Sequence, residues 1–183
     1  MRTTLLAAAS LCLAACATLK YQEPLQGPRA RVRFVTSSDL VAVLRAYDDV
    51  NCSQNETEWM RLRNGPLVNP SPKKLGMPMA VYNENAAKEV YVDASRPMHG
   101  MFYGAGRTGS GVYSCAVPFT FAFAAGTDYE VKFAATPGVC QVTVARFVPY
   151  RNDWTLQELA RIDNRVNAAN IGCLDTFRKL RLY

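Results

Sequence analysis

The chain has 183 residues, of which 49% are hydrophobic, and 21 Lys and Arg residues against 15 Asp and Glu residues give it a formal net charge of +6. This length suffices for one domain with a substantial core and excludes two domains of comfortable size. The positive charge is compatible with attraction to lipid phosphates or other anionic polymers, but it does not select a partner.

The first fifteen residues have the pattern of an export signal. Arg2 is the one cation before an apolar stretch of ten residues, from Leu5 to Ala14. A permanent membrane-spanning helix needs about 20 apolar residues, so this stretch is too short to be one. We therefore predict that residues 1–15 are a signal peptide that is removed.

The end of this stretch, Leu13-Ala14-Ala15-Cys16, resembles the lipobox of bacterial lipoproteins. The resemblance implies cleavage between Ala15 and Cys16 and lipidation of the Cys16 thiol, with acyl chains such as palmitate holding the protein to a lipid bilayer. No Asp follows the cysteine, which by the same resemblance favours the outer membrane, facing the periplasm. The alternative is an ordinary secretory signal that is cut near Ala15 and releases a soluble product.

Residues 16–28 contain few apolar side chains and end in Gly27-Pro28, so we expect a lipidated tether followed by a single domain over residues 29–183. Strict alternation predicts the first strand, from Arg29 to Val35. Its outward face carries three cations, Arg29, Arg31 and Arg33. Such a row is a candidate anion-binding site through bidentate hydrogen bonds. The alternative is a solvated face that discourages edge pairing.

Residues 40–47 are rich in strand formers and are expected to form a hairpin with the first strand. Residues 48–85 are polar and contain many chain breakers. They are too long for an ordinary connection, so they hold either short elements or a functional loop. Further strands are predicted at 89–92, 98–103, 112–124, 129–133 and 140–144, and the last three should form an antiparallel meander.

The spacing of Leu156, Leu159, Ile162 and Val166 predicts a C-terminal amphipathic helix packed on the sheet. Alternatively, a final strand ends at Asp163 and a single helix follows it. Together these elements predict a mainly β fold, an antiparallel β-sandwich with a C-terminal amphipathic helix, or an α+β fold if that helix is long.

Four cysteines remain once Cys12 leaves with the signal and Cys16 is lipidated, and they are Cys52, Cys115, Cys140 and Cys173. An even number in an oxidising compartment predicts two disulfides. A zinc site is the rival, but zinc ligands come in pairs two to four residues apart. In the predicted meander Cys115 and Cys140 lie on strands about twice 4.8 Å apart, so we expect Cys52 and Cys173 each to bond one of them.

The chain has one histidine, His99, and catalysis there would need a nucleophile and a group that orients the ring. No nucleophile motif surrounds His99, and no second histidine offers a metal pair. Residues 104–109 match the dinucleotide pattern Gly-x-Gly-x-x-Gly, but the chain returns to a strand, which indicates a hairpin tip. We therefore predict no catalytic residue, metal or cofactor.

These observations favour a membrane-anchored, non-enzymatic binding or structural module, and the mature chain resembles small lipoproteins of the Gram-negative envelope. An envelope protein or an anionic polymer is the expected partner, and nucleic acid is not expected. The alternative is an enzyme or enzyme inhibitor acting on envelope polymers, with a site in the 48–85 loop near His99. A cleft that holds His99 and a buried carboxylate would favour an enzyme. A convex surface or a flat exposed apolar patch would favour a binder.

Overall fold

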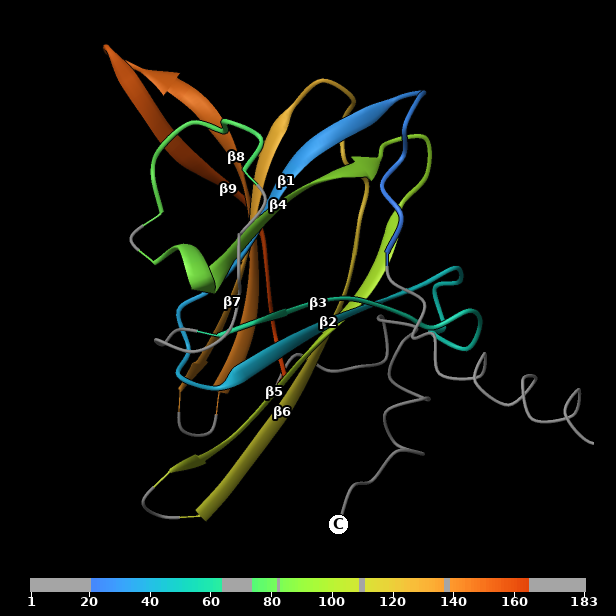
Figure 1. Ribbon diagram of the computed structural model, residues 1–183, viewed down its shortest axis with the longest axis vertical. Helices are drawn as coiled ribbons and strands as arrows, with labels where there is room; N and C mark the ends of the chain where they lie inside the picture. The colour runs from blue at the N-terminus through green and yellow to red at the C-terminus, as the bar shows by residue number, and fades with distance from the viewer. Residues whose placement is uncertain (1–20, 64–73, 82, 109–110, 137–138, 165–183) are drawn as a thin grey trace, which may run out of the picture.

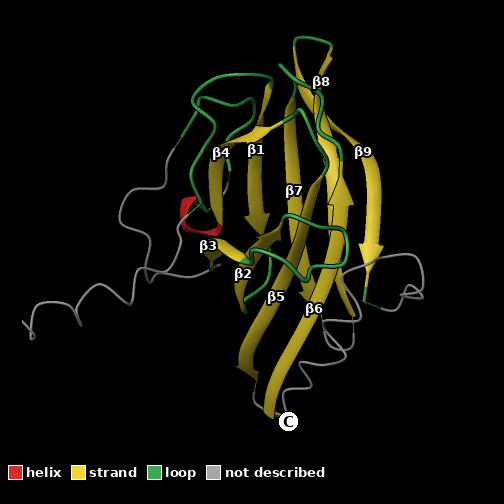
Figure 2. Ribbon diagram, turned by 90° about the vertical axis from the view of Figure 1, so that its right-hand side faces the viewer, coloured by secondary structure: helices red, strands yellow, loops and turns green. Residues whose placement is uncertain are grey.

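The computed structural model describes residues 21–63, 74–81, 83–108, 111–136 and 139–164. In these ranges nine strands form two sheets that pack face to face (Figures 1 and 2). The five-stranded sheet A has the order β4 (Ala87–Asp93), β1 (Arg29–Thr36), β7 (Asp128–Thr136), β8 (Val139–Tyr150), β9 (Asp153–Asp163). The four-stranded sheet B has the order β3 (Thr57–Leu62), β2 (Val41–Tyr47), β5 (Met98–Thr108), β6 (Gly111–Phe121). A short 3₁₀ helix, η2 (Glu84–Ala86), precedes β4.

The core lies between the two sheets and is built from alternating side chains. In β1 the predicted alternation is confirmed, because Ala30, Val32 and Phe34 are fully buried. Phe102 of sheet B lies at the centre of the aromatic cluster, with its ring centroid 6.3 Å from that of Phe34 and 5.3 Å from that of Phe133. Burying side chains of this size stabilises the fold by about 1.5–3 kcal/mol each. With nine strands in two packed sheets over the described residues, the predicted mainly β class is confirmed.

The strand partners differ from those expected. The predicted hairpin of β1 with β2 is wrong, because β1 belongs to sheet A and β2 to sheet B. The neighbours of β1 are β4, which is antiparallel, and β7, which is parallel, so sheet A is mixed. An alternating pattern determines which face of a strand is buried. The same face is buried whether the next strand pairs with it in a hairpin or crosses to the opposite sheet, so the pattern does not identify the partner.

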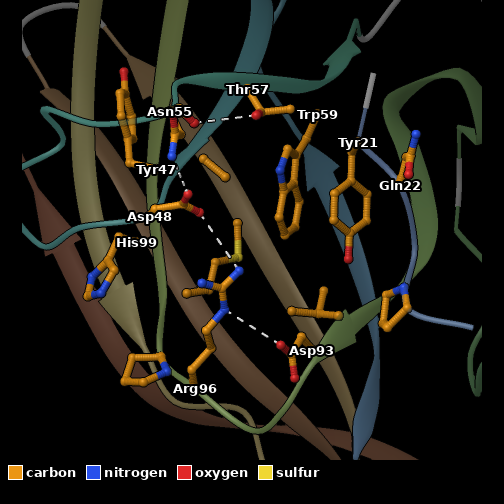
Figure 3. A pocket seen from close by; sticks show the side chains of 15 residues that line it. Tyr21, Gln22, Tyr47, Asp48, Asn55, Thr57, Trp59, Asp93, Arg96 and His99 are labelled. Atoms are coloured by element: carbon orange, nitrogen blue, oxygen red, sulfur yellow. Dashed lines mark hydrogen bonds and ion pairs between the residues drawn. The ribbon is translucent and has the colours of Figure 1, made fainter. Parts of the chain in front are cut away.

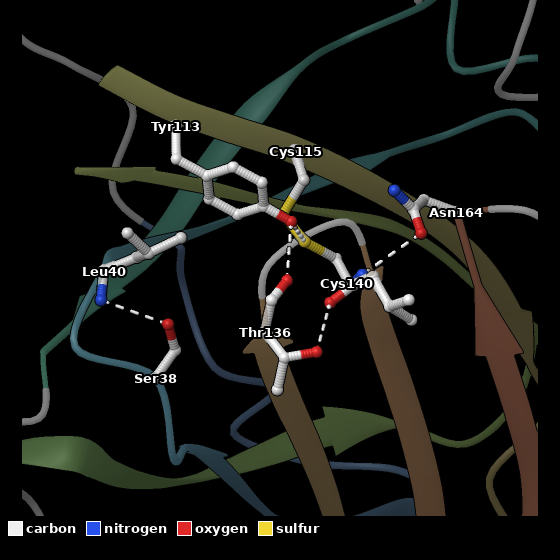
Figure 4. Close-up of a disulfide and its surroundings, with 8 residues drawn as sticks. Ser38, Leu40, Tyr113, Cys115, Thr136, Cys140 and Asn164 are labelled. Atoms are coloured by element: carbon white, nitrogen blue, oxygen red, sulfur yellow. Dashed lines mark hydrogen bonds between the residues drawn. A yellow bond between two sulfur atoms is a disulfide. The ribbon is translucent and has the colours of Figure 1, made fainter. Parts of the chain in front are cut away.

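The predicted meander is also wrong, and its failure changes the disulfide. β7 and β8 form a hairpin, but β6 lies in sheet B. Cys115 of β6 therefore faces Cys140 of β8 across the sandwich, and the two are bonded with a Cα–Cα distance of 6.4 Å (Figure 4). Tyr113 covers the bridge and donates a hydrogen bond to the Thr136 carbonyl at 2.9 Å. Cys52 is also disulfide-bonded, and Cys173 lies outside the described residues.

The expected C-terminal helix is not found where the described chain covers it. Residues 153–163 form β9, which pairs with β8. A bulge leaves Leu159 without a partner on β8, between Glu158, which pairs with Ala145, and Ala160, which pairs with Val144. The extra residue shifts the alternation by one position, so the apolar spacing imitates a helical period. The part of the prediction beyond residue 164 lies outside the described residues.

The 48–85 region contains short elements in its described part, which was one of the two predicted possibilities. β3 forms the edge of sheet B, and residues 74–81 lie against β1 and β4 on the outer side of sheet A. The Leu75 amide donates a hydrogen bond to the Glu89 carboxylate there. This region therefore contributes to both layers of the sandwich.

Candidate functional site

The arginine row of β1 points away from the core as predicted, but part of it is covered. The Arg33 side chain is 3% exposed and lies 2.9 Å from the Glu89 carboxylate and 3.8 Å from that of Glu130. Arg33 also donates to the carbonyls of Met77 and Pro78. Burial raises the pKa of Glu130, against the lowering effect of Arg33. The Arg33 guanidinium is thus part of the fold's internal structure.

The other two cations of the row also have protein partners. Arg31 makes a two-pronged contact with Asp128, with distances of 2.7 and 2.6 Å. Arg29 donates to the Pro24 and Leu25 carbonyls, and its guanidinium lies over the Tyr91 ring. An anion binding to this row would have to displace these contacts, so anion binding here stays a prediction.

Figure 3 shows the lining of a pocket of about 470 Å³. The pocket lies at the edge of the sandwich away from β6 and β8, which carry the Cys115–Cys140 disulfide. It lies where β3, the edge of sheet B, comes near β4, the edge of sheet A, and its size is in the range of small-molecule sites. Its lining comes from five parts of the chain: Tyr21, Gln22, Pro24; Ala46, Tyr47, Asp48; Asn55, Thr57, Trp59; Val92, Asp93; Arg96, Pro97, Met98, His99.

Trp59 reaches this pocket because of a bulge in β3. Leu44 pairs with Met60 and the next residue of β2 pairs with Glu58, which leaves Trp59 as the extra residue. Bulges at sheet edges re-aim a side chain in this way. The indole packs edge-on against Phe34 of the core, with centroids 6.2 Å apart. The position of Trp59 is therefore fixed by the core.

Tyr21 forms a second part of the same wall. Its ring stacks on Trp59 with centroids 3.7 Å apart (Figure 3). Its hydroxyl donates to the Tyr91 carbonyl of β4 at 2.6 Å. Burial, with the nearby carboxylate of Glu23, raises the pKa of Tyr21, which keeps the hydroxyl a neutral donor. The segment after residue 20 thus lies along the open edge of the sandwich, and a free tether can extend only over the residues before Tyr21.

A short charged row crosses the pocket. Arg96 lies between two carboxylates, with its Nε 3.5 Å from Asp93 and its Nη2 3.8 Å from Asp48 (Figure 3). Hydrogen bonds from the Ser95 hydroxyl and amide hold the pKa of Asp93 below its ordinary value. The side chains of Arg96, Asp93 and Asp48 are 64%, 41% and 47% exposed, so all three are accessible to a ligand.

His99 lies in this pocket, at the start of β5, next to residues of the 48–85 region as the alternative hypothesis required. Its Nδ1 is 3.0 Å from the Thr120 hydroxyl. The pocket is a cleft that holds His99, as expected of an enzyme, but its two carboxylates are exposed, so the buried carboxylate that was also expected is not among its described lining. The convex or flat apolar surface expected of a binder is not what this edge of the sandwich presents. Within the described ranges no group of three or more His, Cys, Asp or Glu residues could hold a metal ion.

Sequence reasoning singled out His99 but missed the side chains that shape the pocket. Trp59 follows three polar residues and precedes Met60, and Arg96 lies between an acidic strand end and a proline. Both are weak signals of a site. Tyr21 was assigned to the tether. These positions are separated by 38 and 37 residues along the chain, so no local motif joins them.

The chain matches no family model, no curated protein and no solved structure. No helix in the described part of the chain is long and apolar enough to cross a bilayer. Function is therefore inferred from the chain's own residues.

Proposed function

We propose that this protein is a lipid-anchored protein of the bacterial envelope, in the outer membrane facing the periplasm, and that its β-sandwich is a non-enzymatic binding module. The observation that carries the proposal is the pocket at the open edge of the sandwich. It combines an aromatic wall with exposed donors and acceptors at strand ends and in the adjoining loops, which is the composition of a ligand site. The lipobox-like segment ending at Cys16 supports the anchor.

Binding is favoured over catalysis by the surroundings of His99. A general base needs a nucleophile or a bound water within about 2.6–3.2 Å, and a partner that orients the ring. Among the described residues the His99 ring is hydrogen-bonded to the Thr120 hydroxyl and has no carboxylate partner that would orient it. Thr120 is itself an exposed residue of β6, outside the pocket lining. We therefore assign His99 a place in the wall of the pocket.

The anchor is tested by the mass of the protein in the membrane fraction. We expect a chain that starts at Cys16 and carries added acyl mass. The Cys16→Ser variant should lose its attachment, because two or three acyl chains are what makes such anchoring stable. A Cys16→Ser protein that stays membrane-bound and is processed normally would show the anchor to be wrong.

The binding module is tested by incubating the purified protein with an envelope extract and identifying retained molecules by mass spectrometry. The pocket variant is Arg96→Gln. Its matched control is Arg161→Gln, because Arg161 is a similarly exposed arginine that also pairs with an acid three residues before it, on β9. A ligand retained by the wild type and the control but lost by Arg96→Gln supports the module. Identical retention by all three proteins would refute the pocket as the site.

His99→Ala separates the binder from the enzyme. Because His99 only lines the pocket of the binding module, we expect this variant to fold, to stay membrane-attached and to weaken ligand retention less than Arg96→Gln does. A His99→Ala protein that retains the ligand like the wild type yet fails to restore a phenotype of the gene deletion would favour the enzyme or enzyme inhibitor instead.

A further inference from the structure

The charges of the pocket disfavour two large classes of ligand. Arg96 is flanked on both sides by carboxylates, those of Asp48 and Asp93. A phosphate or carboxylate that reached the guanidinium would also meet these two anions. An amine that reached either carboxylate would meet the guanidinium. Like charges at such distances repel, so the row is best matched by an uncharged ligand.

Hydroxyl groups match the alternation of donors and acceptors in this row. A guanidinium only donates hydrogen bonds and a carboxylate only accepts them, whereas a hydroxyl does both. Two neighbouring hydroxyls can therefore bind side by side, one accepting from Arg96 and the other donating to Asp48 or Asp93. The ion pairs are long, at 3.5 and 3.8 Å, so a ligand can enter the row without breaking close contacts. Such charge-assisted hydrogen bonds are stronger than neutral ones.

Part of the remaining wall is apolar. Trp59 is held between the ring of Tyr21 and the core, and Pro97 and Met98 line the pocket beside the charged row. A ligand that fits both parts has a nonpolar face and a rim of neighbouring hydroxyls, as a pyranose ring does. We propose that the pocket binds a neutral saccharide. This proposal deepens the proposed function and rests on the pocket being the binding site.

The wall formed by Tyr21 also places the pocket close to the proposed anchor. Tyr21 follows Cys16 by five residues, and five fully extended residues span at most about 18 Å. If Cys16 is acylated, this wall therefore lies within about 18 Å of the lipid. The saccharide is accordingly met near a membrane surface, either as a lipid headgroup or as a free glycan.

The test measures saccharide binding in two arms with the full mature chain. Calorimetry follows titration of the wild-type protein with maltose, lactose and N,N′-diacetylchitobiose. Co-sedimentation of the unacylated Cys16→Ser protein uses phosphatidylcholine vesicles with and without digalactosyldiacylglycerol, and phosphatidylglycerol vesicles as the anionic probe. We expect binding in at least one saccharide arm, and Arg96→Gln should weaken it about tenfold or more, as removal of a charged hydrogen-bond donor does. Arg161→Gln should bind like the wild type.

Binding of the free sugars alone would identify a free glycan, and binding of the glycolipid vesicles would identify a headgroup. The proposal is overturned if no saccharide probe binds, if Arg96→Gln binds as well as the wild type, or if phosphatidylglycerol vesicles are preferred. If no saccharide binds but a molecule from the envelope extract is still retained by the wild type and lost by Arg96→Gln, the saccharide proposal fails and the proposed binding module is kept. An unacylated Cys16 in cells would instead remove the anchor while leaving a positive sugar result intact.

Discussion

Removal of the Cys115–Cys140 disulfide should destabilise the sandwich by an amount that follows from its position. The bridge joins residues separated by 25 positions and connects β6 of sheet B with β8 of sheet A. Restricting an unfolded loop of that length is worth about 3.5 kcal/mol at 25 °C. We therefore expect the Cys115→Ala/Cys140→Ala variant to lose about 3.5 kcal/mol of unfolding free energy, plus a smaller loss because Cys140 is fully buried.

Guanidinium unfolding followed by circular dichroism measures this difference. Reduced wild-type protein is compared with it, since it keeps the sulfur atoms of the partly buried Cys115 and the buried Cys140 but also lacks the bond of Cys52. A loss below about 1 kcal/mol in the double variant would refute the loop-entropy reasoning. Peptide mapping without reduction tests the pairing itself. It should show Cys115 linked to Cys140, and, if residues 1–15 are removed and Cys16 is lipidated, it should show Cys52 linked to Cys173 as the remaining pair.

Three further predictions concern the described fold. Glu89→Ala leaves the buried Arg33 without its closest carboxylate and should cost about 3–5 kcal/mol in the same unfolding assay, and a loss below 1 kcal/mol would show the pair to be hydrated. Gly104→Ala places a methyl group 2.8 Å from the Phe133 ring in the core and should cost about 1–3 kcal/mol, whereas an unchanged midpoint would mean that the ring moves freely. Because the pKa of Asp93 is lowered in the fold, its carboxylate stabilises the protein at pH values above the ordinary pKa of 3.8, and this contribution is lost as the pH falls through the folded pKa. Asp93→Asn should therefore flatten the fall of the melting temperature in acid. An unchanged acid profile would contradict this reasoning.

The strands themselves could largely be predicted from the sequence, because a half-buried strand repeats every two residues. Ala30, Val32 and Phe34 show this clearly, and so does the β7–β8 hairpin with its short turn. The partners could not be predicted, because alternation says which face is buried and not which strand lies alongside. The prediction that Cys115 and Cys140 stay apart failed for this reason.

Two β-bulges explain why β9 was predicted as a helix and why β3 was not predicted. Leu159 interrupts the alternation of β9 and made a strand look helical, and Trp59 interrupts β3 and obscured the edge of sheet B. The pocket was invisible because its wall combines residues from distant parts of the chain. Its strongest clue, Tyr21 stacked on Trp59, involves a residue that composition alone assigns to a tether.

The position of β1 in sheet A, between β4 and β7, determines when the sheet can close during synthesis. Arg31 of β1 bonds Asp128 of β7, 97 residues later, and Arg33 bonds Glu89 of β4, 56 residues later. A strand with such distant partners on both sides folds slowly, because its loops must close before its contacts form. The chain grows from its amino terminus, so one hydrogen-bonding edge of β1 stays open until β4 has been made and the other until β7 has been made. Over that interval the first strand to be made is the segment most exposed to wrong pairing with other chains.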